Sequence, residues 1–184
     1  IRPDTFAEFN LLSGSRLDSG WTRFGNTSSD ARSVIKVDGT GTFWRADSLS
    51  LYGNTLLTIS NGGSVESVNN IGLSSTNTAS SQLIVDGMGT TLSTKAQIYL
   101  TNGLSNRLDV LNGGQVSSVG LNIYSSEGTS NIVNVSGKDS LLDVADLIAI
   151  GLEGQDQLQI QSGAQVNSNR SIIGQHIDGV ILAL

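Results

Sequence analysis

The chain has 184 residues, no cysteine, one histidine and a formal net charge of −6, so it can form neither a disulfide framework nor a thiolate metal site. Only 14 % of its residues are charged, and they form no basic stripe of the kind that binds nucleic acid. No apolar run is long enough to cross a membrane as a helix, so we expect no membrane insertion by this segment.

Residues 1–33 are predicted to form a cap and an irregular first coil. Thr5 and Glu8 have the spacing of a capping box, which predicts a short helix over the open end of the fold. From Leu12 onward the sequence resembles the pattern of the later segments, and Leu12 itself stands one repeat length before Val37. An uncovered first coil would present unpaired backbone groups, which is why a cap is expected here.

Two related phrases alternate through residues 34–175, which are predicted to form the regular coils. One phrase reads VIKVDGTGTFW at its first occurrence, and the other reads LLTISNGGSVESV. In each, an apolar anchor precedes a glycine corner, and a second apolar residue follows the corner. The anchors lie 22 to 26 residues apart, at Val37, Ile59, Val85, Val110, Val135 and Ile160. Self-similarity at such a spacing predicts an array of stacked coils.

Within each coil the local pattern predicts strands. Segments such as LTI, LDV and VNV alternate apolar with polar residues, and Gly or Asn clusters supply the backbone angles that sharp corners need. A third apolar pair follows in each coil, so three short strands and three turns are expected. Coils of this kind stack by parallel pairing, and the usual crossover handedness is right-handed. The predicted fold is all-β: one right-handed parallel β-helix, a solenoid of about seven coils of 22–26 residues.

The same alternation predicts which side chains face the core. Ile59, Val110, Val135 and Ile160 should stack inward as a ladder. Asp109, beside Val110, should face solvent and tolerate replacement by alanine. An error of one residue in the register would exchange the two sides.

Residues 176–184 are predicted to begin an incomplete coil. Ile177, Val180 and Leu182 have no later coil in this sequence to pair with. An apolar strand at a sheet edge promotes association. We therefore expect the chain to be part of a longer protein.

The candidate ligand contacts are aromatic. Most of the aromatic residues fall in the first 52 positions, where bulky rings are expected to seal the end of the core. Tyr52, Tyr99 and Tyr124 follow or flank the third apolar pair, so we expect them to point outward on one side of the rod. Such rings stack against sugars, although an exposed tyrosine on a strand also reflects strand preference alone.

We predict no catalytic residue, resident metal or cofactor. His176 is the single histidine, and no nucleophile-elbow sequence accompanies it. The acidic residues between Asp139 and Asp156 offer oxygen ligands to Ca²⁺, but the GGxGxD repeat of calcium-binding β-rolls is absent. Asp38 and Asp86 occupy equivalent corners, where aspartate usually bonds nearby backbone amides. A polysaccharide lyase or hydrolase would need paired carboxylates or a base with clustered cations, and the basic residues are scattered.

The paired phrases VDGTGTFW…LTISNGGSVES and VDGMGTTL…LDVLNGGQVSS resemble repeats of bacterial autotransporter passenger domains and related surface adhesin-like proteins. Trp44 keeps the tryptophan of that pattern, whereas Leu92 and Leu142 replace it. The resemblance implies a secreted β-helical stalk at the bacterial cell surface that acts in adhesion or self-association. Its partners would be a host or neighbouring-cell surface, a glycan, or another copy of the chain.

The alternative hypothesis is that the chain is the β-helical scaffold or glycan-binding module of a carbohydrate-active protein, similar to polysaccharide lyases. Fold alone does not decide between the two, because one scaffold serves many functions.

Overall fold

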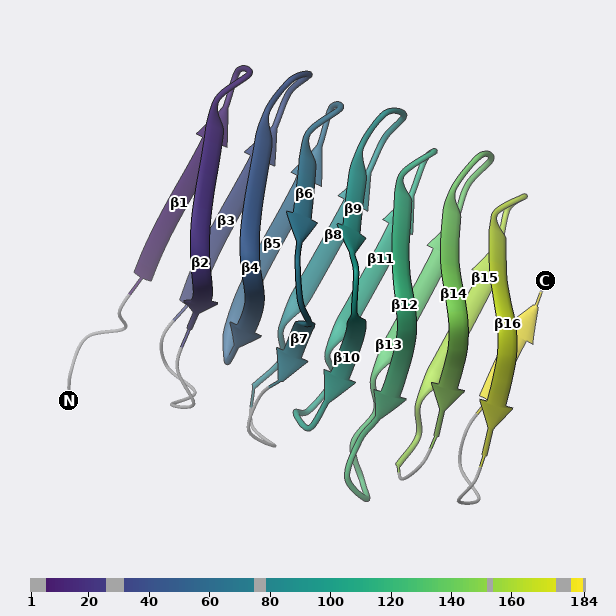
Figure 1. Cartoon of the computed structure of the whole chain (residues 1–184). Coiled ribbons are helices and arrows are strands. Elements are labelled where there is room, and N and C mark those ends of the chain that lie inside the picture. The colour runs from purple at the N-terminus through teal and green to yellow at the C-terminus, as the bar shows by residue number, and fades with distance from the viewer. Residues whose placement is uncertain (1–5, 26–31, 75–78, 152–153, 175–179, 184) are drawn as a thin grey trace, which may run out of the picture.

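The computed structural model describes residues 6–25, 32–74, 79–151, 154–174 and 180–183, and all the regular structure in them is β-strand. The strands stack into a right-handed parallel solenoid of about six turns, with the two chain ends at opposite ends of the rod (Figure 1). Every strand pair is parallel, as the sequence predicts. The described residues contain no helix that is long and apolar enough to span a membrane.

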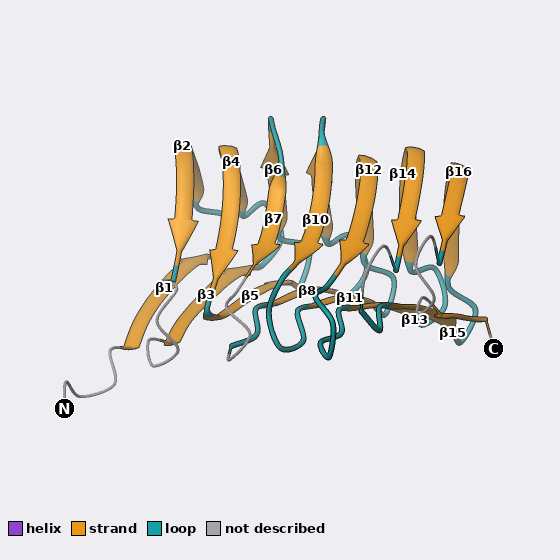
Figure 2. Cartoon of the chain, turned by 90° about the horizontal axis from the view of Figure 1, so that it is seen from below, coloured by secondary structure: helices purple, strands orange, loops and turns teal. Residues whose placement is uncertain are grey.

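Two sheets, here called sheet A and sheet B, form the walls of the solenoid (Figure 2). Sheet A contains, in spatial order, β1 (Phe6–Leu12), β3 (Arg32–Asp38), β5 (Asn54–Ser60), β8 (Gln82–Asp86), β11 (Arg107–Leu111), β13 (Ile132–Ser136), β15 (Gln157–Gln161) and β17 (Val180–Ala183). Sheet B contains β2 (Arg16–Phe24), β4 (Phe43–Tyr52), β6 (Ser64–Ser67), β7 (Ile71–Ser74), β9 (Thr91–Thr94), β10 (Gln97–Thr101), β12 (Gln115–Tyr124), β14 (Leu141–Ile150) and β16 (Gln165–Ile173).

The six anchors pair in register along sheet A, each with the anchor of the next coil. Val110, for example, lies between Val85 and Val135. All the anchors are fully buried except Ile160, which is half-buried near the C-terminal end of the rod. The predicted inward ladder and its register are therefore confirmed.

Among the described residues, a coil has three separate strands only where it consists of β5, β6 and β7, or of β8, β9 and β10. Elsewhere the second and third strands run together, as in β4, β12 and β14, and the pairing of β12 with β14 shifts register between Ser118 and Gly120. In the interrupted coils, hydroxyls of Ser67 and Thr94 donate to the carbonyl of Asn69. These bonds stabilise a turn at a place where the other coils have one continuous strand.

The predicted N-terminal helix is wrong, because residues from Phe6 onward form β1. This strand pairs with β3 over its whole length, which satisfies the backbone groups of that side of β3. Thr5, the first residue of the predicted capping box, lies outside the described residues.

Aromatic packing at this end fits a strand and not a helix. The Phe9 ring reaches inward to Phe24 (6.0 Å between ring centroids) and to Trp44 (6.2 Å). Phe24 meets Trp44 edge-on at 5.8 Å. Phe9, Phe24 and Trp44 therefore seal this end of the core, as predicted. Phe6 and Trp21 do not take part, because both are exposed.

Candidate functional site

Two kinds of corner alternate where the chain passes from sheet A to sheet B. The DG corners are residues 38–42, 86–90 and 136–140; the NG corners are residues 61–63, 112–114 and 162–164. The last residue of each DG corner has a buried hydroxyl that makes two hydrogen bonds. The hydroxyl donates to the backbone carbonyl four residues earlier, and it accepts a hydrogen bond from the backbone N–H of a glycine in the preceding coil. These bonds are Thr42 to Asp38 (2.8 Å) and from Gly14 (2.9 Å), Thr90 to Asp86 (2.9 Å) and from Gly62 (3.0 Å), and Ser140 to Ser136 (2.7 Å) and from Gly113 (3.0 Å).

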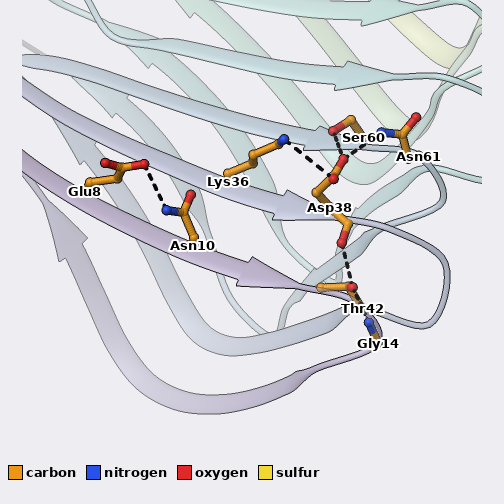
Figure 3. A network of polar contacts seen from close by, with 8 residues as sticks. All are labelled: Glu8, Asn10, Gly14, Lys36, Asp38, Thr42, Ser60 and Asn61. Carbon is orange, nitrogen blue, oxygen red and sulfur yellow. Dashed lines mark hydrogen bonds and ion pairs between the residues drawn. The ribbon is translucent and has the colours of Figure 1, made fainter.

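A carboxylate ties the DG corner to the coil on its other side. Ser60 Oγ donates to Asp38 Oδ1 at 2.6 Å, and Asn61 Nδ2 donates to the same oxygen at 2.7 Å (Figure 3). The bonds from Ser60 and Asn61 hold the pKa of Asp38 below its ordinary value. Asn112 Nδ2 meets Asp86 Oδ1 in the same way at 2.8 Å. These aspartates thus bond side chains of the next coil, whereas the sequence predicted bonds to nearby backbone amides.

The outer face of sheet A carries a network centred on Asp109. This carboxylate accepts from Arg107 Nε (2.7 and 2.8 Å), Gln82 Nε2 (2.9 Å) and Asn134 Nδ2 (3.0 Å), and only 4 % of the residue is exposed. Burial alone would raise the pKa of Asp109, but the bonds from Arg107, Asn134 and Gln82 together hold that pKa below its ordinary value. The prediction that Asp109 faces open solvent is therefore wrong, since neighbouring coils cover an outward-pointing side chain.

A ladder of buried polar side chains, which the predictions from sequence did not include, runs along a second corner. Its members stand four residues before successive anchors: Ser33, Thr55, Ser81, Asn106, Asn131 and Asp156. Asn106 Oδ1 accepts the N–H of Ser81 (2.9 Å), and Asn131 Oδ1 accepts that of Asn106 (3.0 Å). The constant offset of a polar residue from each anchor was the sequence signal for this ladder.

Asp156 is the last described member of this ladder and is fully buried. Its two oxygens accept the backbone N–H groups of Asn131 (2.8 Å) and Ser125 (3.0 Å). Burial raises the pKa of Asp156, and the opposing bonds from Asn131 and Ser125 do not cancel that effect. Both side-chain oxygens are needed as acceptors, which explains why this position has aspartate and not asparagine. The side-chain nitrogen of an asparagine would face the Ser125 N–H, and two donors cannot bond each other.

The three predicted tyrosines lie half-buried on the outer side of sheet B but do not form one cluster. Tyr52 and Tyr124 share a row and are separated by Ser74 and Thr101. At about 4.8 Å per strand, that places their Cα atoms about 14 Å apart. Tyr99 lies in a second row, next to Gly72.

The surroundings of these tyrosines differ. The guanidinium of Arg23 lies over the Tyr52 ring, 4.3 Å from its centroid. Gly72 leaves a gap in the layer of outward side chains between the coils of Tyr52 and Tyr99. Apart from its chain neighbours, no residue has an atom within 4 Å of the place that a Cβ of residue 72 would occupy. Tyr99 therefore lies directly beside this gap, and Tyr52 lies on the preceding coil, two residues beyond the Ser50 that pairs with Gly72. Tyr124 lies apart from it.

A shallow depression of about 370 Å³ crosses β9, β12 and β14 on the same sheet. Ser93, Ser117 and Asp143 form a row across it, flanked by Gln115 and Leu141. Asp143 is the one carboxylate among the described residues that line it. The depression therefore offers hydroxyl and amide groups, without the second carboxylate that glycoside hydrolysis would use.

The acidic residues considered for calcium lie at separate places. Asp139 stands in a turn with a positive φ of 66°, Asp143 lines the depression, Asp146 pairs with Arg170 at 3.0 Å, and Asp156 belongs to the buried ladder. Within the described ranges, no three His, Cys, Asp or Glu side chains come together as metal ligands would. The predictions on His176 and Glu153 fall outside the described residues.

Comparison of this chain with protein-family models, with curated proteins and with solved structures finds no match in any of the three. The assignment of the fold therefore comes from the structure of the chain itself.

Proposed function

We propose that this chain is a non-enzymatic, extracellular β-solenoid scaffold of a bacterial surface protein, acting in adhesion or self-association. The repeat resemblance supports the cell-surface location. The lack of converging carboxylates among the described residues of the depression supports the absence of catalysis. We expect neither hydrolysis nor elimination of common polysaccharides.

The observation that carries self-association is the exposed apolar surface on the outermost strands of sheet B. Within the described part of the chain, β2 pairs only with β4 and exposes 65 % of Trp21, and β16 pairs only with β14 and leaves Ile172 and Ile173 exposed. A strand with one free edge presents unpaired N–H and C=O groups, and apolar side chains beside them favour pairing with another chain.

Sedimentation velocity at rising protein concentration tests this proposal. The wild type should associate as concentration increases, and Trp21→Lys should weaken that association by placing a charge at the free edge. Met88→Lys is the matched control, because Met88 is also exposed but lies at a corner away from both edges. A wild type that stays monomeric throughout, or equal effects of the two substitutions, would contradict association through the edge.

A glycan-binding module is the second candidate function, favoured by the gap over Gly72. Tyr52 and Tyr99 stand on the coils before and after it, with Cα atoms about 12 Å apart by strand geometry. Aromatic rings at that spacing can lean toward a sugar ring and bury its C–H surface. Ser74 and Thr101 supply neighbouring hydroxyls on the same face.

A glycan array distinguishes the two candidates. The triple variant Tyr52→Ala, Tyr99→Ala and Tyr124→Ala removes the rings, while Gly72→Leu keeps them and fills the gap. We expect no strong glycan binding by the wild type. Micromolar binding to one glycan, lost in both variants while the protein stays monomeric, would favour the glycan-binding module over the adhesive scaffold.

A further inference from the structure

Two asparagine–glycine pairs occupy NG corners of the rod. Asn61 and Asn112 are both exposed, with φ values of 52° and 51°, and each is followed by glycine. Asparagine followed by glycine is the pair most prone to deamidation, because glycine has no side chain to hinder attack by its backbone nitrogen.

We propose that Asn61 and Asn112 are latent deamidation sites, protected by the DG corners of the neighbouring coils, and that their reaction prevents those corners from closing again. The DG corners hold both reacting groups of each pair.

The reaction requires only water and a base. At the first pair, the backbone nitrogen of Gly62 loses its proton to solvent base and attacks Cγ of Asn61. An N–Cγ bond forms, the Cγ–Nδ2 bond breaks, and Nδ2 takes up a proton and leaves as ammonia. Water then opens the resulting cyclic imide at either carbonyl, which gives aspartate or isoaspartate.

Stacking withholds both reacting groups. The proton of Gly62 is donated to Thr90 Oγ1 at 3.0 Å, and Thr90 is fully buried, so solvent base cannot take that proton while the corner is closed. The amide of Asn61 is fixed on the other side by Asp38 Oδ1 at 2.7 Å, which opposes the rotation that attack requires. The corner must therefore open before deamidation can begin.

The second pair is held by an equivalent set of bonds. Gly113 N–H donates to the buried hydroxyl of Ser140 at 3.0 Å, and Asn112 Nδ2 donates to Asp86 Oδ1 at 2.8 Å. The two sites thus have separate protecting hydroxyls on different coils. Removing the Ser140 hydroxyl leaves the bonds of Asn61 intact, whereas the corner that contains Thr90 also holds Asn112 through Asp86.

Deamidation replaces an attractive contact by a repulsive one. A carboxylate at position 61 would face the Asp38 carboxylate where an amide N–H donates at present, so two like charges would repel each other at that contact. An isoaspartate would in addition lengthen the backbone ahead of Gly62 and displace its N–H from Thr90. Because the reaction is irreversible, one opening that leads to it leaves a permanent change.

Peptide mapping by mass spectrometry, after incubation of the folded chain at mildly alkaline pH, tests the protection. Thr90→Val should raise the deamidation rate at Asn61 by about tenfold, the factor expected for losing hydrogen bonds of ordinary strength. It should raise the rate at Asn112 by less, because Thr90 also bonds the Asp86 carbonyl in the corner that holds Asn112. Ser140→Ala should raise the rate at Asn112 by a similar factor and leave Asn61 unchanged. Asn102–Gly103, at a different corner, is the reference pair that neither substitution should affect.

Three controls keep the test decisive. Urea-denatured wild type gives the unprotected rate, thermal unfolding shows whether each variant is folded, and Asp38→Ala provides a second way to release Asn61 if Thr90→Val does not fold. Equal rates in folded and denatured wild type would overturn the proposal. So would an equal rise at both sites in each variant, because general loosening rather than local protection would explain it.

The loss of closure is tested by exchanging donor and acceptor. Asn61→Asp should lower the melting temperature, whereas the double variant Asp38→Asn with Asn61→Asp should recover it, since the amide and carboxylate are then present again with their positions swapped. An Asn61→Asp protein as stable as the wild type, or a double variant no better than the single one, would refute this part of the proposal.

Discussion

Replacing Asp109 by alanine removes the shared acceptor of three side chains, and we expect a large cost for an outward-facing position. Arg107 is partly exposed, so its guanidinium regains water, but Asn134 is a buried residue (6 % exposed) whose Nδ2 loses its acceptor. With a net value of about 1 kcal/mol for each ordinary hydrogen bond and more for a charge-assisted one, discounted for the solvent around Arg107, Asp109→Ala should lower the free energy of unfolding by about 2 kcal/mol.

Urea unfolding followed by circular dichroism near neutral pH measures this cost. Thr58→Ala is the matched control, because Thr58 lies in the same outer row of sheet A but takes no part in the Asp109 network. The pKa of Asp109 is lowered by folding, so its contribution is present above the ordinary carboxyl range, near pH 4, and is lost as pH falls through the folded pKa. The difference between wild type and Asp109→Ala should shrink accordingly in acid. A neutral-pH loss no larger than that of Thr58→Ala would refute the network's role.

Three further predictions concern single positions. Gly114→Ala should be strongly destabilising, because the new Cβ would stand 2.4 Å from the Val85 carbonyl oxygen. Gly72→Ala, in contrast, should change the free energy of unfolding by less than about 0.5 kcal/mol. Similar urea midpoints for the two variants would contradict this prediction. Ser118→Ala should raise the melting temperature, since the buried Ser118 hydroxyl has no hydrogen-bond partner in the described structure. Folding raises the pKa of Asp156, so the contribution of this group to stability should fall as pH rises from about 4 through the folded pKa, and this component of the pH dependence of unfolding should vanish in Asp156→Asn.

The sequence by itself determined the repeat, the strand period and the register. A side chain on a strand can face only two ways, and one face of every coil must be apolar, so the spacing of anchors such as Val37 and Ile59 leaves one way to stack them. The glycine corners follow from the same pattern, because positive φ values are needed where the chain turns sharply.

Only the tertiary structure decided what happens between coils. Alternation shows that Asp109 points outward, but its burial depends on Gln82 and Asn134, which lie about one coil away on either side and arrive only when the coils stack. Similarly, the spacing of Thr5 and Glu8 fits a helix cap considered alone. The free backbone groups of β3 favour a strand at that place, because a parallel partner satisfies them along its length.

The same distinction applies to the candidate sites. Outward positions for Tyr52, Tyr99 and Tyr124 follow from sequence parity, but the gap over Gly72 appears only when three coils are placed side by side. The corner bonds of Asn61 likewise join residues of coils on both sides of it. Local sequence pattern fixes the direction of a side chain, whereas its partners are set by lateral stacking, which brings together residues that a reading along the chain keeps apart.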